Sequence, residues 1–370
     1  MKCDFVPISD IANINDRQYS SKEQWSTIHY LDTGNVTKGR VGALQVLNAL
    51  TDKVPSRARR KVKDSSIVYS LVRPNQQHYA LLKEPPNSML VSTGFAVIDA
   101  DKSKVLPRYL YYALTTKEAT SYFQTLAEQS VSTYPTLGVK DLASFKICLP
   151  DIDTQKQVSS ILGTLDKKMN LNYQINDYLA QVASAIYRKT LEELPTCDTL
   201  LSDVATVRYG KGLSKKDLTE EGYPVFGGNG QIGFYTSYLF EDPQILISCR
   251  GAASGNIMIS LPKSYVTSNS LIIELEDRRY YEWLKQHFLA NQLHGFVTGS
   301  AQPQITVDNL KFLTVPFPKY SDIVGTDTQL KHLSDCSYFL NKENTMLETL
   351  RDILLPRLIS GKIDISKVEA

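Results

Sequence analysis

Apolar side chains recur every seven residues along a segment that follows Pro150 and extends to about Leu191. They form two rows, one of Val158, Leu165, Leu179 and Ile186, interrupted by Asn172, and the other of Ile161, Ile175 and Val182. A seven-residue apolar repeat is typical of a coiled-coil seam. Asp151, Asp153 and Thr154 are suitable N-cap residues for the start of the helix. The pattern therefore predicts one long helix with a seam for a partner helix.

A second segment, from about Asp327 to Leu355, repeats this pattern with four leucines at strict seven-residue spacing. Leu330 and Asn344 lie in the neighbouring row. One such segment alone would also fit an amphipathic helix on a globular core, but two in one chain favour pairing with each other, with Asn172 and Asn344 as buried polar residues that fix the register. The predicted seam consists of Val158, Leu165, Asn172, Ile175, Leu179, Leu333, Leu340, Asn344, Leu347 and Leu354.

The rest of the chain reads as mixed α and β structure, which places it in the α+β class. Short apolar or β-branched runs bounded by Gly, Pro and Asn predict strands at 66–72, 90–98, 244–248 and 270–275. Helical stretches are predicted at 107–126 and 280–293.

An internal repeat organises the whole chain. Residues 132–150 (STYPTLGVKDLASFKICLP) return as residues 300–318 (SAQPQITVDNLKFLTVPFP), 168 residues later, with five identities in 19 positions and matching apolar positions. Each copy leads into one of the long helical segments, which open with Thr154-Gln155 and Thr328-Gln329. Upstream, 67–73 (IVYSLVR) resembles 245–250 (ILISCR). We therefore expect a globular domain at 1–150, a central helix at 151–195, a second globular domain at 196–318 and a C-terminal helix at 319–370. The two helices are expected to pair antiparallel as a coiled coil between the two domains, which are related by a pseudo-two-fold repeat.

The net charge of +2 is unevenly distributed. Residues 1–150 carry 19 Lys and Arg against 13 Asp and Glu, an excess of six positive charges, whereas each of the three later segments is slightly negative. The first domain is therefore suited to attract a polyanion, and the second could do so only through a local patch.

The motifs of common enzyme classes are missing from the sequence. It contains no P-loop, no HExxH and no G-x-S-x-G, and the five cysteines are at least 49 residues apart, which excludes a Cys-x-x-Cys zinc pair. Residues 228–233 match G-x-G-x-x-G, but the aromatic, β-prone stretch that follows favours a glycine-rich turn over a dinucleotide site. We expect no catalytic residue and no metal site. No apolar run is long enough for a membrane helix and no signal peptide opens the chain, so we expect a cytoplasmic protein.

Basic residues gather in one short run, Pro55 to Lys63, with five Lys or Arg in seven positions. A solvated charged face is the simpler interpretation, but guanidinium groups beside a serine and a proline also suit a loop that contacts DNA phosphates or guanine edges. Arg73 and Arg250 both lie where a strand meets a loop, in places that we take as equivalent. The candidate DNA-binding residues are Ser56, Arg57, Arg59, Arg60, Lys61, Arg73, Lys211, Lys215, Lys216, Asn229, Gln231 and Arg250.

The order of domain, long helix, domain, long helix resembles the specificity subunit of type I restriction-modification systems. The residues that carry the resemblance are Leu149-Pro150 through Gln155 to Leu165-Asp166, the Asn-rich stretch 170–176, the C-terminal run 354–363 (LLPRLISGKI), and the opening of the second unit at 209–212 and 223–230. The family often has Glu-Gln where this chain has Thr154-Gln155 and Thr328-Gln329.

This resemblance implies a targeting subunit without an active site of its own. Each recognition domain would read one half of a split, asymmetric double-stranded DNA target in the major groove, and the paired helices would set the gap and bind two modification subunits. Those subunits would use S-adenosylmethionine to methylate adenine, and restriction subunits would hydrolyse ATP with magnesium. Two other functions stay open on the residues alone. They are a fused or stand-alone DNA methyltransferase and a coiled-coil scaffold that does not touch nucleic acid.

Overall fold

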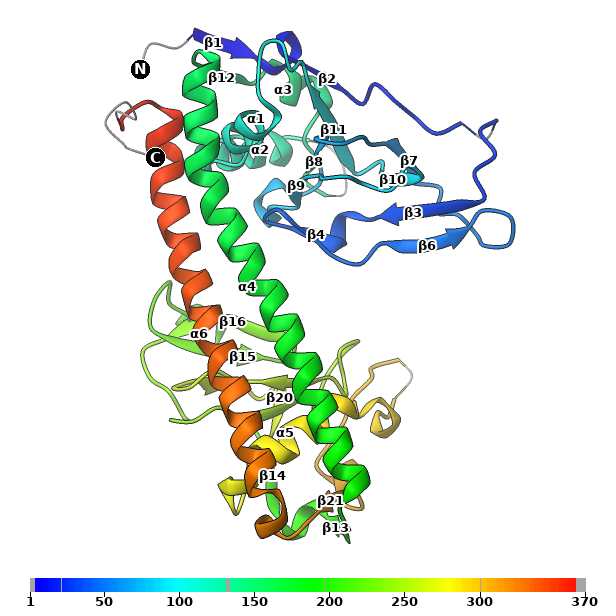
Figure 1. The fold of residues 1–370 in the computed structure, drawn as a ribbon, viewed down its shortest axis with the longest axis vertical. Helices are drawn as coiled ribbons and strands as arrows, with labels where there is room; N and C mark the ends of the chain where they lie inside the picture. Colours follow the sequence, from blue (N-terminus) through cyan, green and yellow to red (C-terminus); the bar gives the residue numbers. More distant parts are fainter. Residues whose placement is uncertain (1–3, 21, 131–133, 196, 300, 364–370) are drawn as a thin grey trace. The chain divides into compact units, whose positions relative to one another are not determined.

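The structure, a computed structural model, describes residues 4–20, 22–130, 134–195, 197–299 and 301–363. The chain forms two units, and each is described by itself. Unit 1 comprises 1–170 and 343–370, and unit 2 comprises 171–342. Two long helices, α4 (Ile152–Glu193) and α6 (Tyr320–Ile359), each contribute one part to unit 1 and the other part to unit 2 (Figure 1).

Unit 1 is built from two four-stranded sheets and two strand pairs. The first sheet has the order β2-β11-β8-β9 and the second the order β6-β3-β10-β7, while β1 pairs with β12 and β4 with β5. The strands are β1 (Asp4–Pro7), β2 (Ala12–Ile14), β3 (Thr27–Leu31), β4 (Val36–Thr37), β5 (Arg40–Val41), β6 (Gln45–Asn48), β7 (Ala58–Lys61), β8 (Ile67–Ser70), β9 (Tyr79–Leu81), β10 (Met89–Ser92), β11 (Phe95–Ala100) and β12 (Lys146–Leu149). The helices are α1 (Pro107–Leu114), α2 (Lys117–Glu128) and α3 (Val139–Ser144).

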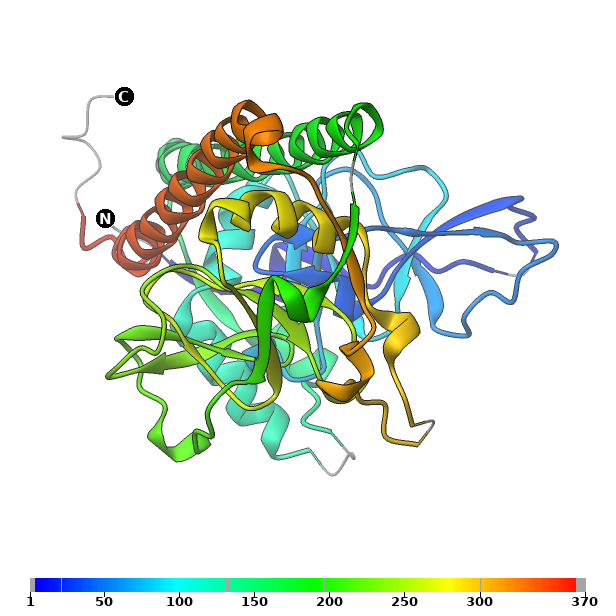
Figure 2. The ribbon, with the colours of Figure 1, turned by 90° about the horizontal axis from the view of Figure 1, so that it is seen from below.

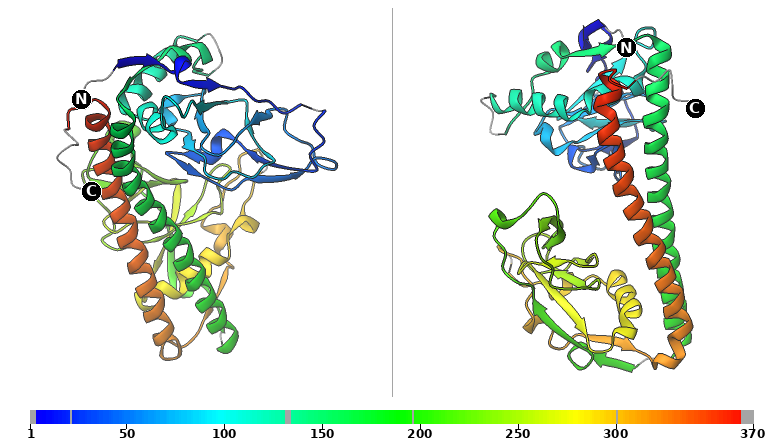
Figure 3. Two further views of the ribbon diagram at one scale, coloured as in Figure 1. Left: turned by 45° about the horizontal axis from the view of Figure 1, so that its top comes forward. Right: turned by 90° about the vertical axis from the view of Figure 1, so that its left-hand side faces the viewer.

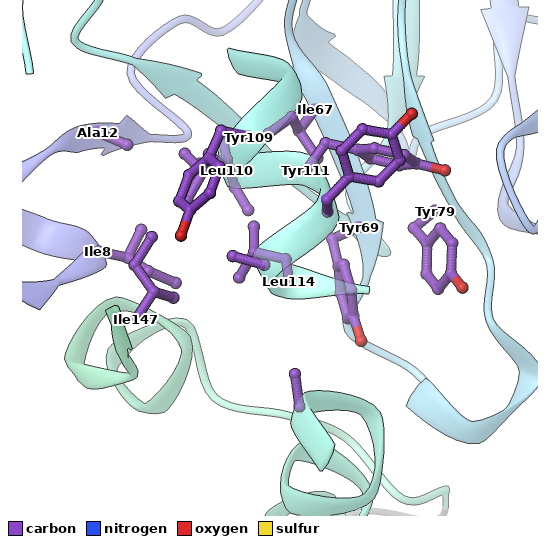
Figure 4. Close-up of a cluster of buried hydrophobic side chains, with 14 of the residues drawn as sticks. Ile8, Ala12, Ile67, Tyr69, Tyr79, Tyr109, Leu110, Tyr111, Leu114 and Ile147 are labelled. Atoms are coloured by element: carbon purple, nitrogen blue, oxygen red, sulfur yellow. The ribbon is translucent and has the colours of Figure 1, made fainter. Parts of the chain in front are cut away.

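Helix α1 occupies the centre of the main core of unit 1. Leu110 and Leu114 lie between Ile8 and Ile147 on one side and Tyr69 on the other (Figure 4). The long helices close the same core, since Val158 and Leu162 of α4 and Leu355 and Leu358 of α6 belong to this cluster of buried apolar side chains. Burial of these apolar side chains is the main contribution to the stability of the unit.

Unit 2 repeats this plan. The sheet β14-β20-β17-β18 corresponds to β2-β11-β8-β9, the sheet β16-β15-β19 corresponds to β6-β3-β10, and β13 pairs with β21 as β1 pairs with β12. Both central pairings of the second sheets, β3 with β10 and β15 with β19, are parallel. The strands are β13 (Cys197–Leu200), β14 (Ala205–Tyr209), β15 (Tyr223–Gly227), β16 (Gly230–Tyr235), β17 (Ile245–Ser248), β18 (Ile257–Ile259), β19 (Tyr265–Val266), β20 (Ser270–Leu275) and β21 (Thr314–Phe317).

One helix of unit 2, α5 (Tyr281–Ala290), lies between the sheets and the α4–α6 pair (Figures 2 and 3). Trp283 of α5 is fully buried and donates a hydrogen bond to the carbonyl of Pro316 (2.9 Å). Tyr109 of α1 makes the equivalent bond to the carbonyl of Cys148 (2.8 Å), 168 residues before Pro316. The internal repeat is therefore confirmed in the topology and in individual hydrogen bonds.

The paired helices run antiparallel within each unit. In unit 1, Arg351 forms an ion pair with Asp166 (3.5 Å), and Asn344 donates to the carbonyl of Met169 (3.4 Å). In unit 2, Asn176 bonds Asn341 (3.0 Å) and Thr190 bonds Thr326 (3.1 Å). As residue numbers rise along α4 they fall along α6, so the prediction of an antiparallel helix pair is confirmed.

One residue of the two rows predicted on α4, Val182, is wrongly placed in the seam. Val158 and Asn172 are fully buried and Leu165 and Leu179 are half-buried, as expected for the first row. In the second row Ile161 and Ile175 are half-buried as well, but Val182 is 47% exposed. The fully covered positions beside the first row lie one residue further along, at Leu162, Met169 and Ala183. Apolar residues flank the first row on both sides, and packing against the unit cores decides which flank is covered. On α6, Leu330 and Asn344 are buried and Leu333, Leu340, Leu347 and Leu354 are half-buried.

The second long helix begins at Tyr320, seven residues before the apolar repeat that is recognisable from about Asp327. Both helices start two residues after the repeated proline, at Ile152 and Tyr320, so Gln155 corresponds to Ile323 and not to Gln329. Gln155 is buried and bonds the carbonyl of Pro150 (2.9 Å), whereas Gln329 is exposed. The start of α6 is polar and contains Gly325, but burial of Ile323 in the core of unit 2 holds it in the helix.

Two predicted elements are each divided in two. The run 90–98 contains the end of β10 and most of β11, separated by Thr93-Gly94. The predicted helix 107–126 is α1 followed by α2, and the hydroxyl of Thr116 caps α2 by accepting from the backbone N–H of Ala119 (3.1 Å). Strands at 66–72, 244–248 and 270–275 and the helix at 280–293 are confirmed as β8, β17, β20 and α5.

Candidate nucleic-acid interface

The basic run of unit 1 forms the edge strand β7 and the turn before it. The backbone N–H of Ala58 donates to the carbonyl of Pro55 (2.9 Å), which closes the turn that presents Ser56 and Arg57. β7 then pairs antiparallel with β10. Successive side chains of a strand point to opposite sides, so the five basic residues cannot all share one environment.

Arg60 and Lys61 are engaged within the unit. Burial lowers the pKa of the half-buried Arg60 guanidinium. Lys61 forms an ion pair with Glu23, which lowers the pKa of that carboxyl, and its ammonium group lies 5.3 Å from the ring centroid of Trp25. The Lys61 side chain therefore holds the strand against the segment at 23–25. Arg60 Nη1 is buried without a hydrogen-bond partner among the described residues.

Arg57 and Arg59 are exposed, together with Ser56. Neither guanidinium forms an ion pair within the part of the chain that the structure describes, and Arg59 bonds only the carbonyl of Ser56 through Nε (3.3 Å). The remaining N–H groups of both side chains are available to phosphate or to base edges.

Arg73 follows β8 and is exposed, with its guanidinium 4.8 Å from the ring centroid of Tyr134. Its backbone has φ of 49°, in the left-handed region, and its N–H donates to the carbonyl of Pro135 (2.9 Å). The repeated segment 134–136 therefore fixes the position of Arg73, and Tyr134 provides an exposed ring beside it.

In unit 2 the glycine-rich segment is the tight turn between β15 and β16, as predicted, with Gly230 at φ 103°. Asn229 and Gln231 are exposed at this turn. A Cβ on Gly228 would lie 3.5 Å from Ser248 Oγ and 3.1 Å from the carbonyl oxygen of Asn269, so the turn abuts the end of β17.

Other basic candidates of unit 2 surround this region. Lys211 is exposed and its backbone N–H donates to the carbonyl of Val266 (2.9 Å), directly before the 267–269 segment. Arg250 is exposed two residues beyond the end of β17. Lys215 and Lys216 are exposed in a single 3-10 turn after Ser214. The structure thus brings the turn at 228–229, Lys211 and Arg250 to one end of the sheets.

The same end of unit 1 carries Arg57 and Arg73. The N–H of Thr93 donates to the carbonyl of Arg57 (2.9 Å), and the N–H of Leu71 to that of Gly94 (2.8 Å). In unit 2 the latter bond is repeated between Cys249 and Asn269 (3.2 Å). Each unit therefore presents exposed cations at an equivalent sheet end.

The pairing of Arg73 with Arg250 as equivalent residues is wrong by one position. Gly251 donates to the carbonyl of Pro303 (2.9 Å) as Arg73 donates to that of Pro135, and both have positive φ. Arg250 corresponds to Val72 instead, since both residues pair with the repeated segment, at Gln304 and Thr136. The one-residue shift could not be detected from the sequences, because the loops that follow the two strands differ and give no residues to align.

Sequence reasoning missed Tyr134 and its repeat equivalent Gln302, both exposed beside these strand ends. They lie inside the repeated segments, whose matching apolar positions indicate a structural role rather than a binding site. The sequence signal was that the residue directly before the repeated proline differs between the two copies and is aromatic in one and polar in the other.

Within the described residues, no three His, Cys, Asp or Glu side chains are placed to hold a metal ion. Among the same residues, no helix has the length and apolar content needed to cross a bilayer.

Comparison with known proteins agrees with these observations. A family model described as type I restriction modification DNA specificity domain matches residues 2–181 and again 199–349. The HindI specificity subunit of a type I restriction enzyme from Haemophilus influenzae is 29% identical over 211 residues, which is 57% of this chain and 45% of that relative. The chain thus matches less than half the length of that protein.

Two further similarities extend over more of the chain. The MjaIX specificity subunit of Methanocaldococcus jannaschii is 18% identical over 362 residues, 86% of this chain and 82% of that one. The crystal structure of the type I restriction-modification S subunit from M. genitalium matches with a TM-score of 0.56 at 16% identity, over 97% of this chain and 96% of that chain, which supports the fold. Because the family model matches most of the chain in two copies, this protein belongs to the type I restriction modification DNA specificity family.

Proposed function

We propose that this chain is a non-catalytic specificity subunit that directs a type I restriction-modification complex to double-stranded DNA. The domain at 1–150 would read one half of a bipartite, asymmetric target, and the domain at 196–318 the other half. The observation that carries the proposal is the duplicated sheet end, where Arg57, Arg59 and Arg73 in unit 1 and Lys211 and Arg250 in unit 2 are exposed. Arg and Lys at loop tips suit both phosphate and guanine contacts.

The helices at 151–195 and 319–370 would set the gap between half-sites and bind two modification subunits. Both helices carry apolar side chains that stay exposed. On α6 of unit 1, Met346, Leu350 and Ile353 follow one helical face and are 44–60% exposed. On α4 of unit 2, Leu171 and Tyr178 are 50% and 67% exposed. Exposed apolar stripes of this kind favour a protein partner.

In this assembly the modification subunits supply S-adenosylmethionine chemistry, and restriction subunits use ATP and magnesium. The chain itself would need no cofactor. It would act in the cytoplasm, where the bacterial or archaeal chromosome is accessible. The seam residues would serve the helix pair, leaving the exposed stripes for the subunits.

The test is to express the chain with its modification subunits in a host that lacks other adenine methylation and to sequence the methylome. A bipartite methyladenine motif is expected, and its absence from an assembled complex would contradict the proposal. Incubating the purified chain alone with DNA and labelled S-adenosylmethionine separates the stand-alone methyltransferase, which would transfer label without a partner. Retardation of duplex DNA by the complex at physiological salt separates the scaffold that ignores nucleic acid.

A further inference from the structure

Unit 1 contains a groove of about 800 Å³ that holds none of the candidate DNA-binding residues. The first half of α4 forms one wall, with Ser160, Thr164 and Lys167. The opposite wall is the turn after β7 and the segment that follows β9, and the start of α1 lies at the base.

Cations dominate this lining. Lys83, Lys102 and Lys167 are exposed, Arg108 is half-buried, and none of the four forms an ion pair within the described part of the chain. A fifth, Lys156, is paired with a carboxylate on its own helix turn. Lys102 is near enough to Asp64 to help lower the pKa of that carboxyl, but five cations face two carboxylates in this lining. An excess of positive side chains on a concave surface raises the local potential and favours a negatively charged ligand.

The position of Arg108 depends on a glycine. A Cβ on Gly163 would lie 2.7 Å from Arg108 Nη1 and 3.4 Å from its Cδ, so the arginine lies directly across α4 at this residue. Glycine inside a helix costs about 1 kcal/mol relative to alanine. Gly163 is buried under this side chain, which gives the glycine a specific role in placing the guanidinium.

Ser159 adds an unsatisfied hydroxyl to the same groove. Its residue is only 7% exposed, it lines the groove, and its Oγ has no hydrogen-bond partner within the described residues. Buried hydroxyls are normally hydrogen-bonded, because leaving one unsatisfied destabilises the fold. The Oγ itself is covered, so an oxygen acceptor brought by a ligand would satisfy it once the side chains around it move aside.

The groove is not uniformly basic or polar. Leu81, Leu106 and Pro107 provide apolar surface, and the carboxylates of Asp64 and Glu84 lie on the wall opposite α4. A continuous row of DNA phosphates would meet these carboxylates, whereas a peptide can place a carboxylate at Arg108 and an apolar side chain against Leu106. Protein partners combine charge and apolar area in this way at their interfaces.

We propose that this groove binds an acidic protein segment in which carboxylates flank an apolar side chain, with one carboxylate received by Arg108 and Ser159 and others by Lys102 and Lys167. The site goes beyond the proposed function, because it lies outside the candidate DNA interface and concerns a protein ligand.

The probe is a short fluorescein-labelled peptide of glutamates with two leucines, titrated with the full-length chain and followed by anisotropy. Arg108→Glu and Lys167→Glu are each expected to weaken its binding by about tenfold or more, since charge reversal turns attraction into repulsion. Lys140→Glu makes the same charge change at an exposed site outside the groove and is expected to stay within about twofold of the parent. Ser159→Ala is expected to weaken binding without lowering the melting temperature, because its hydroxyl has no partner to lose.

Three outcomes would overturn the proposal. Unchanged peptide binding by Arg108→Glu would remove the central contact. Equal binding of a matched glutamine-leucine peptide would show that charge is not recognised. Loss of duplex DNA binding by Arg108→Glu, with the acidic peptide unaffected, would assign the groove to DNA phosphate instead. Because methylation of the bipartite target is measured separately, failure of this site is distinguishable from failure of the proposed function.

Discussion

Arg57 and Arg59 are expected to contact DNA, whereas their neighbour Lys61 is expected to stabilise the fold. The three residues lie within five positions of one another, so sequence alone treats them alike. Arg57 and Arg59 are exposed without an ion pair among the described residues, but the Lys61 side chain is 22% exposed and paired with Glu23. The perturbation is therefore Arg57→Ala, Arg59→Ala and, as the matched control, Lys61→Met.

The magnitude follows from the kind of contact that is lost. One phosphate contact lowers the slope of log K against log salt by about 0.9, so raising salt about fourfold costs the parent roughly 3.5-fold more affinity than the variant. One guanine contact costs about 1–3 kcal/mol, or about 5- to 150-fold, on the cognate site alone. Lys61→Met should leave the slope unchanged and lower the free energy of unfolding only slightly, because the Glu23 pair is open to solvent and such pairs contribute little.

The assay is fluorescence anisotropy of the assembled complex on a cognate and a scrambled duplex across a salt series, with urea unfolding of each variant. Parallel loss on both duplexes with a smaller slope identifies a phosphate contact. Loss confined to the cognate duplex identifies a base contact. The reasoning is refuted if Lys61→Met changes the salt slope as much as Arg59→Ala, or if neither arginine variant differs from the parent.

Three further predictions concern stability and specificity. Leu162→Ala should cost about 2–5 kcal/mol in urea unfolding because Leu162 is fully buried, whereas Val182→Ala, at a position 47% exposed, should change stability by less than about 0.5 kcal/mol, and equal effects would contradict the burial. Burial raises the pKa of Asp327 to about 6, helped by the charge of nearby Glu282. The ionised carboxylate therefore lowers the free energy of unfolding in full above about pH 6, whereas below the unfolded-state pKa of 3.8 the residue is protonated and has no such effect. Asp327→Asn should therefore gain about 1 kcal/mol near neutral pH, after allowance for partial exposure, and nothing at about pH 4. The exposed Asp322→Asn on the same helix is the control, and a pH-independent gain would refute the assignment. Exchanging residues 1–150 for another recognition domain should change one half of the methylated motif, and a methylome in which both halves change would contradict independent units.

The two long helices could be predicted from sequence because their signal is local. Apolar residues at seven-residue spacing require only that one helix face be covered, and the whole pattern lies within one continuous segment of the sequence. The repeat at 132–150 and 300–318 was visible for a related reason, since each copy must form the same edge strand and lead into the same helix. Their ends were less predictable. Ile323 extends α6 backwards because unit 2 buries it, and no residue near Tyr320 signals this.

The candidate interface was predicted in kind but not in detail. Composition and the basic run at 55–63 pointed to a polyanion-binding first domain, because the number and positions of charged residues can be read directly from the sequence. Which cations reach solvent depends on strand pairing over long separations. Lys61 forms an ion pair with Glu23 and lies over the ring of Trp25, and both residues are far from β7 in sequence. Arg60 is partly buried.

The sequence by itself thus determined the helix period and the duplication, and it indicated a polyanion as the ligand of the first domain. All three are properties of spacing and composition. The tertiary structure alone decided that Arg73 corresponds to Gly251, that Leu162 and not Ile161 is fully buried, and that Arg108 crosses Gly163 beside the unsatisfied Ser159. These facts depend on which distant segments pack together. Contacts between distant segments are set by the balance of burial, strand register and hydrogen bonding over the whole unit, and that balance is not encoded in any single stretch of residues.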